Sequence, residues 1–405
     1  MARLQDFLHE QTTPEGARII VLRRPGSGVV DVRLALPFAR VVPGLSAPME
    51  LLAACLVDDC RTRQDMAEHA GSVRAALGPE ELVVSAGALA SGTEPLIAAV
   101  TEAATAARYT LPAVDRARRR LASRPRTGLG RRTELLLEGW PGAAAFAPAP
   151  ADALAETGPG DLEKTHLRLI APAGAVLVIV GDVIAEQAME AACGRLSGWR
   201  GAPPCLDLPE RELAGAEQVA FLPEPGEAPT EMVLHGPAPK LGAPGHAAFH
   251  LANLLVAGFF SGRLVQRLRH RAEIAYQVDS SIRRFRRTAW TEISARAVAG
   301  TRPDALLQQT SAALDELAES GPAPGELEAA RRFSLGTLRT ACTSGGALAD
   351  AMTGYALSGE HPLWMLSREE SLAAAGAGEV TDEIRARLTP RSLSGVVSFG
   401  TLRGS

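Results

Sequence analysis

The chain has 405 residues, a formal net charge of −4 and 46% hydrophobic residues. That length suffices for two domains with a core each, and this balance excludes general disorder and nucleic-acid binding through bulk positive charge. Lysine occurs only at Lys164 and Lys240, so arginine dominates the basic residues throughout the chain, including regions without any functional pattern. Arginine richness alone therefore does not indicate a phosphate site.

The N-terminal sequence MARLQDFLHEQTT has scattered charges and no apolar stretch, so it does not read as a secretory signal. The apolar run from Ala175 to Val180 has the length of a strand and is too short to span a bilayer. The cysteines are odd in number and contain no CxxC pair: Cys55, Cys60, Cys193, Cys205 and Cys342. We therefore expect reduced thiols and a cytoplasmic protein without a membrane segment.

In chain order, the first half is predicted to alternate strands and helices. Apolar residues with period two, or in short continuous runs, predict strands at 18–22, 30–38, 81–89 and 175–180. Longer apolar stretches and cap signals predict helices at 47–57, from Thr93 onward, and at 112–123, 132–138 and 161–169. The segment GSVRAALG, residues 71–78, is interpreted as a loop between elements.

The second half repeats this plan. ARIIVLRRPGSGVVDVRLALPFAR aligns with EQVAFLPEPGEAPTEMVLHGPAPK, and SAGALASGTEPL aligns with SARAVAGTRPDAL. Both halves then continue into an arginine-rich helix and end on a short apolar strand. The conserved order of four separate features indicates two copies of one module, joined near residues 202–214. We therefore predict an α+β fold of two homologous domains in tandem, 1–203 and 214–405, each with an antiparallel-type sheet packed by helices.

The segment from Leu254 to Ser281 carries the clearest functional pattern, LLVAGFFSGRLVQRLRHRAEIAYQVDSS. It predicts the end of one helix, a glycine-marked turn and a short amphipathic helix with Leu264 and Leu268 on one face. A strand is expected at 274–278. The other face of the short helix carries Arg263, Arg267 and Arg269.

Arg269 ends this helix and Tyr276 enters the strand seven residues later. A guanidinium and a phenol brought together in this way could donate hydrogen bonds to the carbonyl oxygens of an extended peptide. A solvated helix end followed by a half-buried strand residue is the alternative interpretation of the same spacing.

LRHRAEIAY resembles the arginine–tyrosine segment in the C-terminal half of the M16 zinc peptidases, the pitrilysin and mitochondrial-processing-peptidase-like family. The matching positions are Ser261, Arg263, Leu264, Leu268, Arg269, Ala275 and Tyr276. Glu273-Ile274 stands where the family has a glycine ahead of the final Ala-Tyr pair. The resemblance implies two similar α+β domains per chain and two such chains enclosing a chamber.

The zinc-binding sequence that the resemblance implies is missing. Active members carry HxxEH on the first-half helix after a Pro-Gly turn, with a third, acidic ligand on a later helix. Aligned on Pro43-Gly44, the histidine positions are Ala47 and Leu51, and Glu50 remains. No acidic residue lies between Asp115 and Glu134, so no metal site is predicted, and Glu50 is expected to be a surface or interface carboxylate.

Two further patterns in the second half are candidates for sites. His246 and His250 are four residues apart on an expected helix and could bind a metal, but they lack a neighbouring glutamate and a third ligand. The arginines between Arg263 and Arg287 have few aromatic neighbours, so a solvated or chamber-lining face fits them better than a nucleic-acid site. There is also no phosphate-binding glycine loop followed by lysine and no GxSxG sequence.

The resemblance implies a non-catalytic, substrate-binding subunit of a heterodimeric M16 metallopeptidase, inactive alone. Arg269 and Tyr276 would hold the peptide, and an HxxEH-bearing partner would hold the zinc, so no cofactor is expected in this chain. The surplus arginines favour an acidic peptide, and neither nucleic acid nor membrane is expected as a partner. The alternative is a catalytically inert M16-like protein that binds peptides or serves as a scaffold.

Overall fold

The computed structural model describes residues 2–38, 45–57, 66–123, 135–146, 148–201, 208–211, 219–226 and 228–401. The chain forms two compact units. The first unit contains residues 1–125, 144–208 and 340–366, and the second contains residues 126–143, 209–339 and 367–405. Over the described residues, no helix has both the length and the apolar character required to cross a membrane.

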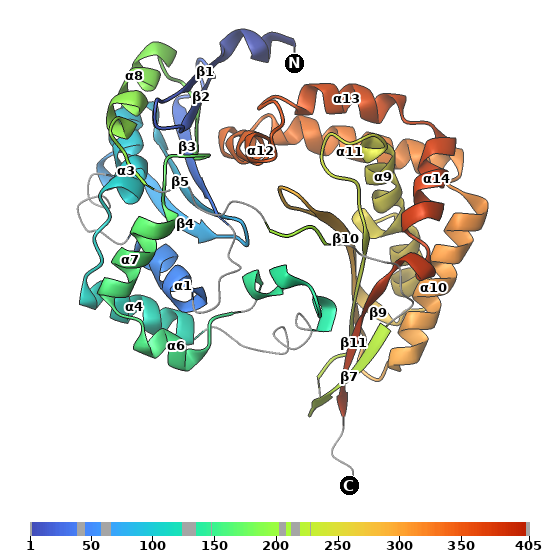
Figure 1. The fold of residues 1–405 in the computed structure, drawn as a ribbon. Coiled ribbons are helices and arrows are strands. Elements are labelled where there is room, and N and C mark those ends of the chain that lie inside the picture. Colours follow the sequence, from blue (N-terminus) through green and yellow to red (C-terminus); the bar gives the residue numbers. More distant parts are fainter. Residues whose placement is uncertain are drawn as a thin grey trace. The chain divides into compact units, whose positions relative to one another are not determined.

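The first unit is built on a six-stranded mixed sheet in the order β1-β2-β6-β3-β5-β4 (Figure 1). Its central strands are rich in β-branched residues and buried on both faces, as in VLVIVG of β6. β2 pairs with β6 in parallel, and the remaining pairs are antiparallel. The strands are β1 (Leu8–Thr12), β2 (Arg18–Arg23), β3 (Val29–Pro37), β4 (Ser72–Leu77), β5 (Glu81–Leu89) and β6 (Val176–Gly181).

Alanine- and leucine-rich helices pack against this sheet and supply its main hydrophobic core. They are α1 (Ser46–Cys55), α3 (Thr93–Thr105), α4 (Leu111–Ala122), α6 (Ala151–Glu156), α7 (Pro159–Leu169) and α8 (Ala185–Leu196). Short 3-10 turns are η1 (Ala2–Phe7), η2 (Ala90–Gly92) and η3 (Pro141–Ala145). From the second half of the chain comes α12 (Gly345–Leu357), which packs on β3 and β6.

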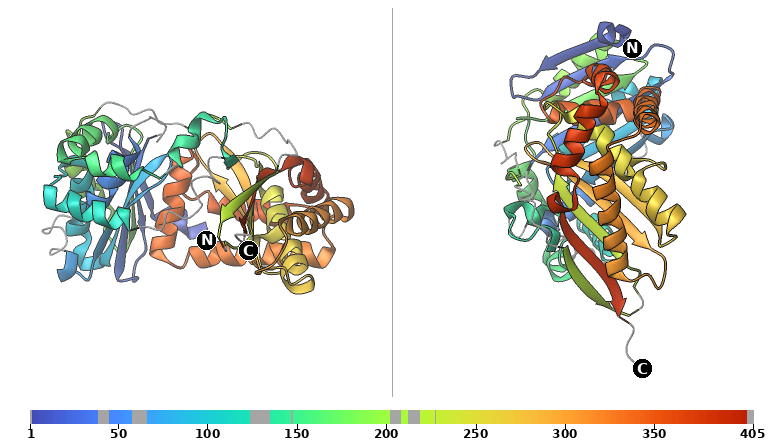
Figure 2. Two further views of the ribbon diagram at one scale, coloured as in Figure 1. Left: turned by 90° about the horizontal axis from the view of Figure 1, so that it is seen from below. Right: turned by 90° about the vertical axis from the view of Figure 1, so that its right-hand side faces the viewer.

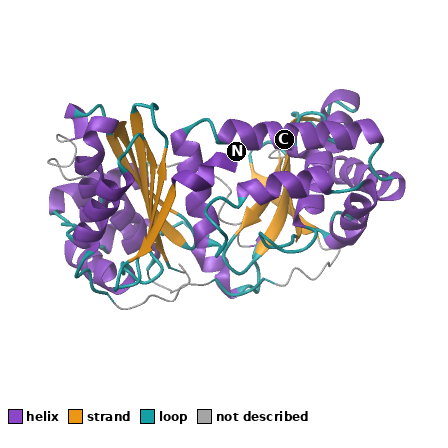
Figure 3. Cartoon of the chain, turned by 90° about the horizontal axis from the view of Figure 1, so that it is seen from above, coloured by secondary structure: helices purple, strands orange, loops and turns teal. Residues whose placement is uncertain are grey.

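The second unit is built on a five-stranded sheet in the order β7-β11-β8-β10-β9. Its strands are β7 (Val219–Pro225), β8 (Glu231–Pro237), β9 (Ala275–Arg284), β10 (Ala289–Ala297) and β11 (Ser394–Thr401). The helices are α9 (His246–Asn253), α10 (Pro303–Ser320), α11 (Pro324–Ala341), α13 (Met365–Ala374) and α14 (Ala377–Arg387), with the 3-10 turn η6 (Pro390–Ser392). Figure 2 shows β7 and β11 side by side next to α10, and Figure 3 shows the helical layers beside the strands.

The two sheets confirm the internal repeat. Five strands of the first sheet follow the order β2-β6-β3-β5-β4, and the second sheet follows the corresponding order β7-β11-β8-β10-β9. In both, the first strand pairs in parallel with the last strand of its half, which pairs antiparallel with the second. Pro37 and Pro237, aligned in the sequence, end β3 and β8. The predicted α+β class with two similar sheets packed by helices is therefore correct.

The halves also exchange corresponding segments. After α4, residues 126–143 of the first half belong to the second unit; after α11, residues 340–366 of the second half belong to the first unit. The side chain of Arg33 in β3 is 5% exposed, and its guanidinium donates to Asp350 of α12 at 2.5 Å and to the Gly346 carbonyl at 3.2 Å. Each compact unit is therefore built from several separate segments of the chain. The predicted ranges 1–203 and 214–405 describe one continuous segment for each domain.

Some local predictions were wrong. Residues 71–78 contain the edge strand β4, which pairs with β5 from Ser72 to Leu77. The helices predicted in the segment from Leu254 to Ser281 are present, as the π-helices η4 (Leu254–Gly258) and η5 (Val265–Arg271). Pro43-Gly44 and residues 132–134 of a predicted helix lie outside the described residues.

Candidate substrate-binding site

Two of the four arginines at 263–271, before β9, are held by neighbouring helices. Arg263 binds Glu326 with 2.7 Å between Nε and Oε1, and Arg267 donates to Gln309 at 2.9 Å. On the opposite face, Leu264 and Leu268 are fully buried. These contacts fix the helix from both sides.

Arg269, on the last turn of η5, is different. Its side chain is exposed, and the described contacts include no hydrogen bond or ion pair to it. Its position near the C-terminal end of a helix favours a cation. Arg269 is thus a guanidinium available to a ligand on a helix that is itself firmly packed.

The helix ends at Glu273 through a left-handed residue. Glu273 has φ +55°, a region that costs non-glycine residues about 1–2 kcal/mol. The N–H of Ile274 then donates to the Leu268 carbonyl at 2.9 Å, which closes the helix end. Glu273-Ile274 stands where the resemblance implies a glycine, and Glu273 has a φ that glycine adopts without strain.

Tyr276 lies in a β-bulge at the start of β9, an edge strand of its sheet. Arg296 of β10 is opposite Gln277, whereas Ala297 is opposite Ala275, so the register shifts by one and Tyr276 is the extra residue. Its side chain is 50% exposed. Bulges redirect a side chain out of the alternating pattern and often occur beside functional sites.

Arg296, on the strand next to this bulge, pairs with a carboxylate on its other side. It lies directly opposite Glu231 of β8, and the two side chains form an ion pair with 2.6 Å between Nε and Oε1. Attraction by Glu231 and interaction with the Tyr276 phenol raise the pKa of the Arg296 guanidinium above its usual value. Glu231 and Arg296 therefore link β8 to β10 beside the bulge of β9 that contains Tyr276.

The structure places both predicted residues, Arg269 and Tyr276, at exposed positions on either side of the Glu273 turn. No described hydrogen bond joins Arg269 to Tyr276, and Arg296 lies opposite Gln277, the residue after Tyr276. Sequence reasoning missed Arg296 and Glu231. Their pairing depends on strand register, which the repeat alignment did not supply for β9 and β10.

A second polar cluster lies on the same two strands, β8 and β10. The His235 ring interacts with Glu292 through Nε2 at 3.3 Å and with Arg211 through Nδ1 at 3.1 Å. Burial lowers the pKa of His235, and the bond from His235 lowers that of Glu292. These contacts fit a neutral imidazole that donates from Nε2 and accepts from Arg211, whose guanidinium also lies 4.8 Å from the Trp290 ring centre. This cluster anchors residues 209–211 to the sheet.

The helix that corresponds to the zinc-binding helix of active M16 peptidases cannot hold zinc as they do. Ala47 is 2% exposed and Leu51 is fully buried, both within the hydrophobic core under the first sheet. Neither side chain has a lone pair to offer a metal. Glu50 accepts a hydrogen bond from the backbone N–H of Ala149 at 2.9 Å, in agreement with a structural carboxylate.

His246 and His250 lie on α9 in the second unit. His250 Nε2 contacts the Ser334 hydroxyl at 3.0 Å, and His246 Nδ1 contacts the Pro239 carbonyl at 3.4 Å. Burial, and then the charges of Arg284 and Arg368, lower the pKa of His246 to about 4 and that of His250 well below its usual value. Among the described residues, no group of three or more His, Cys, Asp or Glu side chains is arranged to hold a metal.

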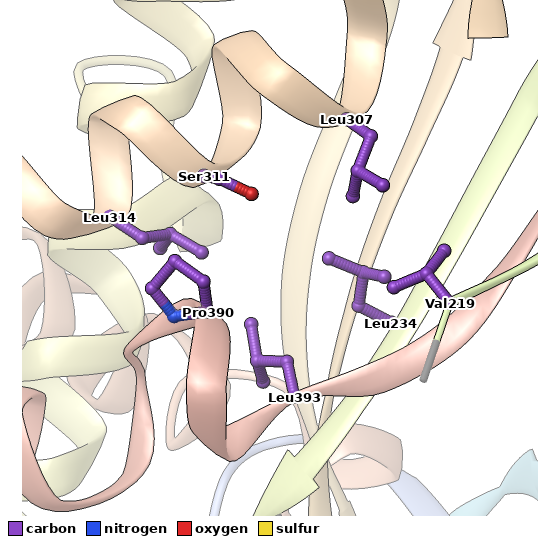
Figure 4. Close-up of a pocket in the computed structure, with 7 residues that line it drawn as sticks. All are labelled: Val219, Leu234, Leu307, Ser311, Leu314, Pro390 and Leu393. Atoms are coloured by element: carbon purple, nitrogen blue, oxygen red, sulfur yellow. The ribbon is translucent and has the colours of Figure 1, made fainter. Parts of the chain in front are cut away.

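A small cavity of about 250 Å³ lies between the second sheet and α10 (Figure 4). Six of its lining side chains are apolar and one, Ser311, carries a hydroxyl. They are Val219, Leu234, Leu307, Ser311, Leu314, Pro390 and Leu393. The cavity offers no charged or acid–base group, so no chemistry is assigned to it.

Comparison with known proteins agrees with the resemblance to M16 peptidases. Residues 159–333 match the family model described as "Peptidase M16 inactive domain". No curated protein matches the sequence. Similar solved structures include a protease from Helicobacter pylori, with a TM-score of 0.87 and 14% identity over 97% of this chain and 99% of that one.

Two further structures are informative. The peptidase M16 inactive domain from Pseudomonas fluorescens has a TM-score of 0.86 and 16% identity, over 98% of this chain and 99% of that one. The periplasmic protease PqqL from Escherichia coli has a TM-score of 0.76 and 12% identity, over 97% of this chain and 47% of that one. At such low identity these likenesses establish the fold. Together with the match of residues 159–333, they support an inactive M16-like protein, and the sequence contains no HxxEH.

Proposed function

We propose that this chain is the non-catalytic, substrate-binding subunit of a heterodimeric M16 zinc metallopeptidase. The observation that carries the proposal is a contrast within one polypeptide. The arginine–tyrosine segment presents Arg269 and Tyr276 to solvent on well-packed elements, whereas the positions for zinc ligands, Ala47 and Leu51, are part of the core. A partner chain carrying HxxEH would supply the metal.

Arg269 and Tyr276 would act on the peptide carbonyl next to the scissile bond. The guanidinium and the phenol O–H would each donate a hydrogen bond to the carbonyl oxygen, on which negative charge grows as water attacks the carbon. Donors fixed before the reaction stabilise this charge without reorganising, and loss of one such donor typically costs about 10²–10³-fold in kcat. The bulge and the closed helix end support this role because they fix where the two side chains start.

The β9–β10 connection supports an acidic substrate. The connection and the end of β9 carry Arg283, Arg284, Arg286 and Arg287 around Phe285, which stacks on Trp290 with 4.5 Å between ring centres. Clustered positive charge attracts acidic chains and raises their local concentration. We further propose a cytoplasmic location, since the cysteines are odd in number and contain no CxxC pair.

The test is to purify this chain with its natural partners and to mix it with an HxxEH-bearing M16 chain from the same source. The proposal predicts peptide hydrolysis by the mixture and none by either chain alone. A stable complex without hydrolysis would instead identify an inert peptide-binding or scaffold protein. Stoichiometric zinc in the isolated chain, together with hydrolysis by it alone, would contradict both.

A further inference from the structure

The cavity between the second sheet and α10 lies where the sheet is short of side chains. Val219 of β7 and Leu234 of β8 both pair with Gly395 of the strand between them, β11, and Gly395 has no side chain to place there. Leu234 leans over this position, since a Cβ at Gly395 would lie 2.7 Å from Leu234 Cδ2. Protein cores are close-packed, and spaces larger than a water molecule are few in a domain. The cavity of about 250 Å³ is therefore a distinct feature of this sheet and its helix.

The helix side of the cavity carries its one hydroxyl. Leu307, Ser311 and Leu314 are spaced by four and three residues, so they share one face of α10. Figure 4 shows the Ser311 hydroxyl directed into the space between the apolar side chains. Thr310, one residue earlier, donates to the Leu306 carbonyl at 2.8 Å, whereas Ser311 forms no hydrogen bond with another residue of the described chain. Ser311 can therefore donate a hydrogen bond to a molecule in the cavity or accept one from it.

We propose that this cavity binds a small, neutral, largely hydrocarbon molecule whose single hydroxyl or carbonyl group bonds to Ser311. The six apolar side chains favour hydrocarbon, because burial removes its surface from water and close packing adds dispersion contacts. An apolar cavity of about 150 Å³ in another protein holds benzene, so about 250 Å³ suits a molecule of about ten non-hydrogen atoms. A charged group would lose its hydration without gaining a counter-ion, because none of the seven described lining residues is charged.

The cavity can be reached from solvent and is separate from the arginine–tyrosine segment. Part of its wall is only partly buried, namely Val219, Leu307, Ser311 and Pro390. Its buried end, where each residue is at most 3% exposed, is formed by Leu234, Leu314 and Leu393. Neither Arg269 nor Tyr276 lines the cavity, so ligand binding here does not depend on the proposed function.

The test titrates the full chain with 4-ethylphenol and measures the heat of binding. One molecule per chain should bind with a Kd of about 0.1 mM, in the range open to a ligand of this size in an apolar site. 4-Ethylbenzoate, which has a carboxylate in place of the hydroxyl, should bind about tenfold more weakly or worse. Absence of saturable binding of 4-ethylphenol by the wild-type chain would overturn the proposal, and so would equal affinity for 4-ethylbenzoate.

Two variants of Ser311 assign the binding to this cavity. Ser311→Ala keeps the space and removes the hydroxyl, so Kd for 4-ethylphenol should rise about fivefold while Kd for ethylbenzene stays the same. Ser311→Leu fills the space and should abolish binding of both ligands. Gln308→Leu, an exposed change on the same helix, is the matched control and should bind both like wild type.

Wild-type affinity for both ligands in folded Ser311→Leu would show that they bind elsewhere and would contradict the proposed cavity site. Circular dichroism reports whether Ser311→Leu is folded. If it is not, Ser311→Ala decides the point, since it removes one oxygen atom only. An unchanged Kd for 4-ethylphenol in Ser311→Ala, or an equal rise for both ligands, would overturn the role of the hydroxyl and with it the proposal.

Discussion

The Arg33 guanidinium and the Asp350 carboxylate form an ion pair with 2.5 Å between Nε and Oδ1, joining β3 to α12 across 317 residues of sequence. Arg33 is almost completely buried, and Asp31, 3.6 Å away, is the only other carboxylate paired with it among the described residues. Burial raises the pKa of Asp31, so this nearby carboxyl is a poorer substitute for Asp350. The exchanged segment 340–366 therefore depends on a charged contact as well as on apolar packing.

Asp350→Asn should destabilise the first unit by about 1–2 kcal/mol, because a buried guanidinium loses its closest carboxylate while the half-exposed Asp350 itself is easily solvated. Urea unfolding followed by circular dichroism measures this as a lower midpoint. Glu190→Gln, an exposed change on α8, is the control and should stay within about 0.5 kcal/mol of wild type. Equal midpoints for Asp350→Asn and wild type would show that the ion pair does not hold α12.

Glu273→Gly should stabilise the second unit by about 1 kcal/mol, since glycine adopts φ +55° without the strain that Glu273 carries. Ala272→Gly is the matched control one residue earlier, where φ is −88°, and should destabilise by a similar amount. Thermal unfolding of both variants measures the pair of opposite shifts. A loss of stability in Glu273→Gly would contradict the strained helix end.

The free energy of unfolding should decrease at acidic pH because of His246. The pKa of His246 is lowered to about 4 in the folded chain, whereas it is near 6.5 in the unfolded chain. Below about pH 6.5 the unfolded chain therefore binds a proton at His246 more readily than the folded chain does, which favours unfolding. The contribution is complete above about pH 6.5 and is lost as pH falls toward 4, by about 3 kcal/mol in all. Urea midpoints of His246→Gln should therefore depend less on pH in this window, whereas those of exposed His270→Gln should follow wild type. Parallel curves for His246→Gln and wild type would refute this.

The basic β9–β10 connection predicts a salt-dependent affinity. KM for an acidic peptide should rise several-fold between about 0.02 M and 0.5 M salt, since screening weakens attraction by exposed charges. A neutral peptide of the same length should show a nearly constant KM. The idea of an acidic substrate would be abandoned if both peptides responded alike.

Much of the fold could be predicted because the apolar periodicities are local. VLVIVG at 176–181 is a continuous run of β-branched and apolar residues, and apolar side chains alternate in 29–37. Both patterns predict a strand without reference to any other part of the chain. The edge strand β4 was missed because SVRAAL has few β-branched residues and becomes a strand only by pairing with β5. The exchange of 340–366 was missed for the same reason: its acceptor, Arg33, is distant in sequence.

The site could be predicted only in part. Arg269 and Tyr276 stand in a recognisable segment, and the loss of HxxEH is visible at Ala47 and Leu51. The pair Glu231–Arg296 carries no signal in the sequence, because arginines are abundant and the pairing depends on strand register between β8 and β10. The sequence shows Glu273-Ile274 in place of the glycine that the resemblance implies, but only the backbone shows that Glu273 is left-handed.

The most direct test of the central claim is kcat for peptide hydrolysis by this chain mixed with its HxxEH partner, with zinc content measured in the same samples. Arg269→Ala and Tyr276→Phe should each lower kcat by about 10²-fold or more while the zinc content of the complex stays the same. Wild-type kcat in both variants would contradict the claim that this chain holds the peptide for a partner's metal.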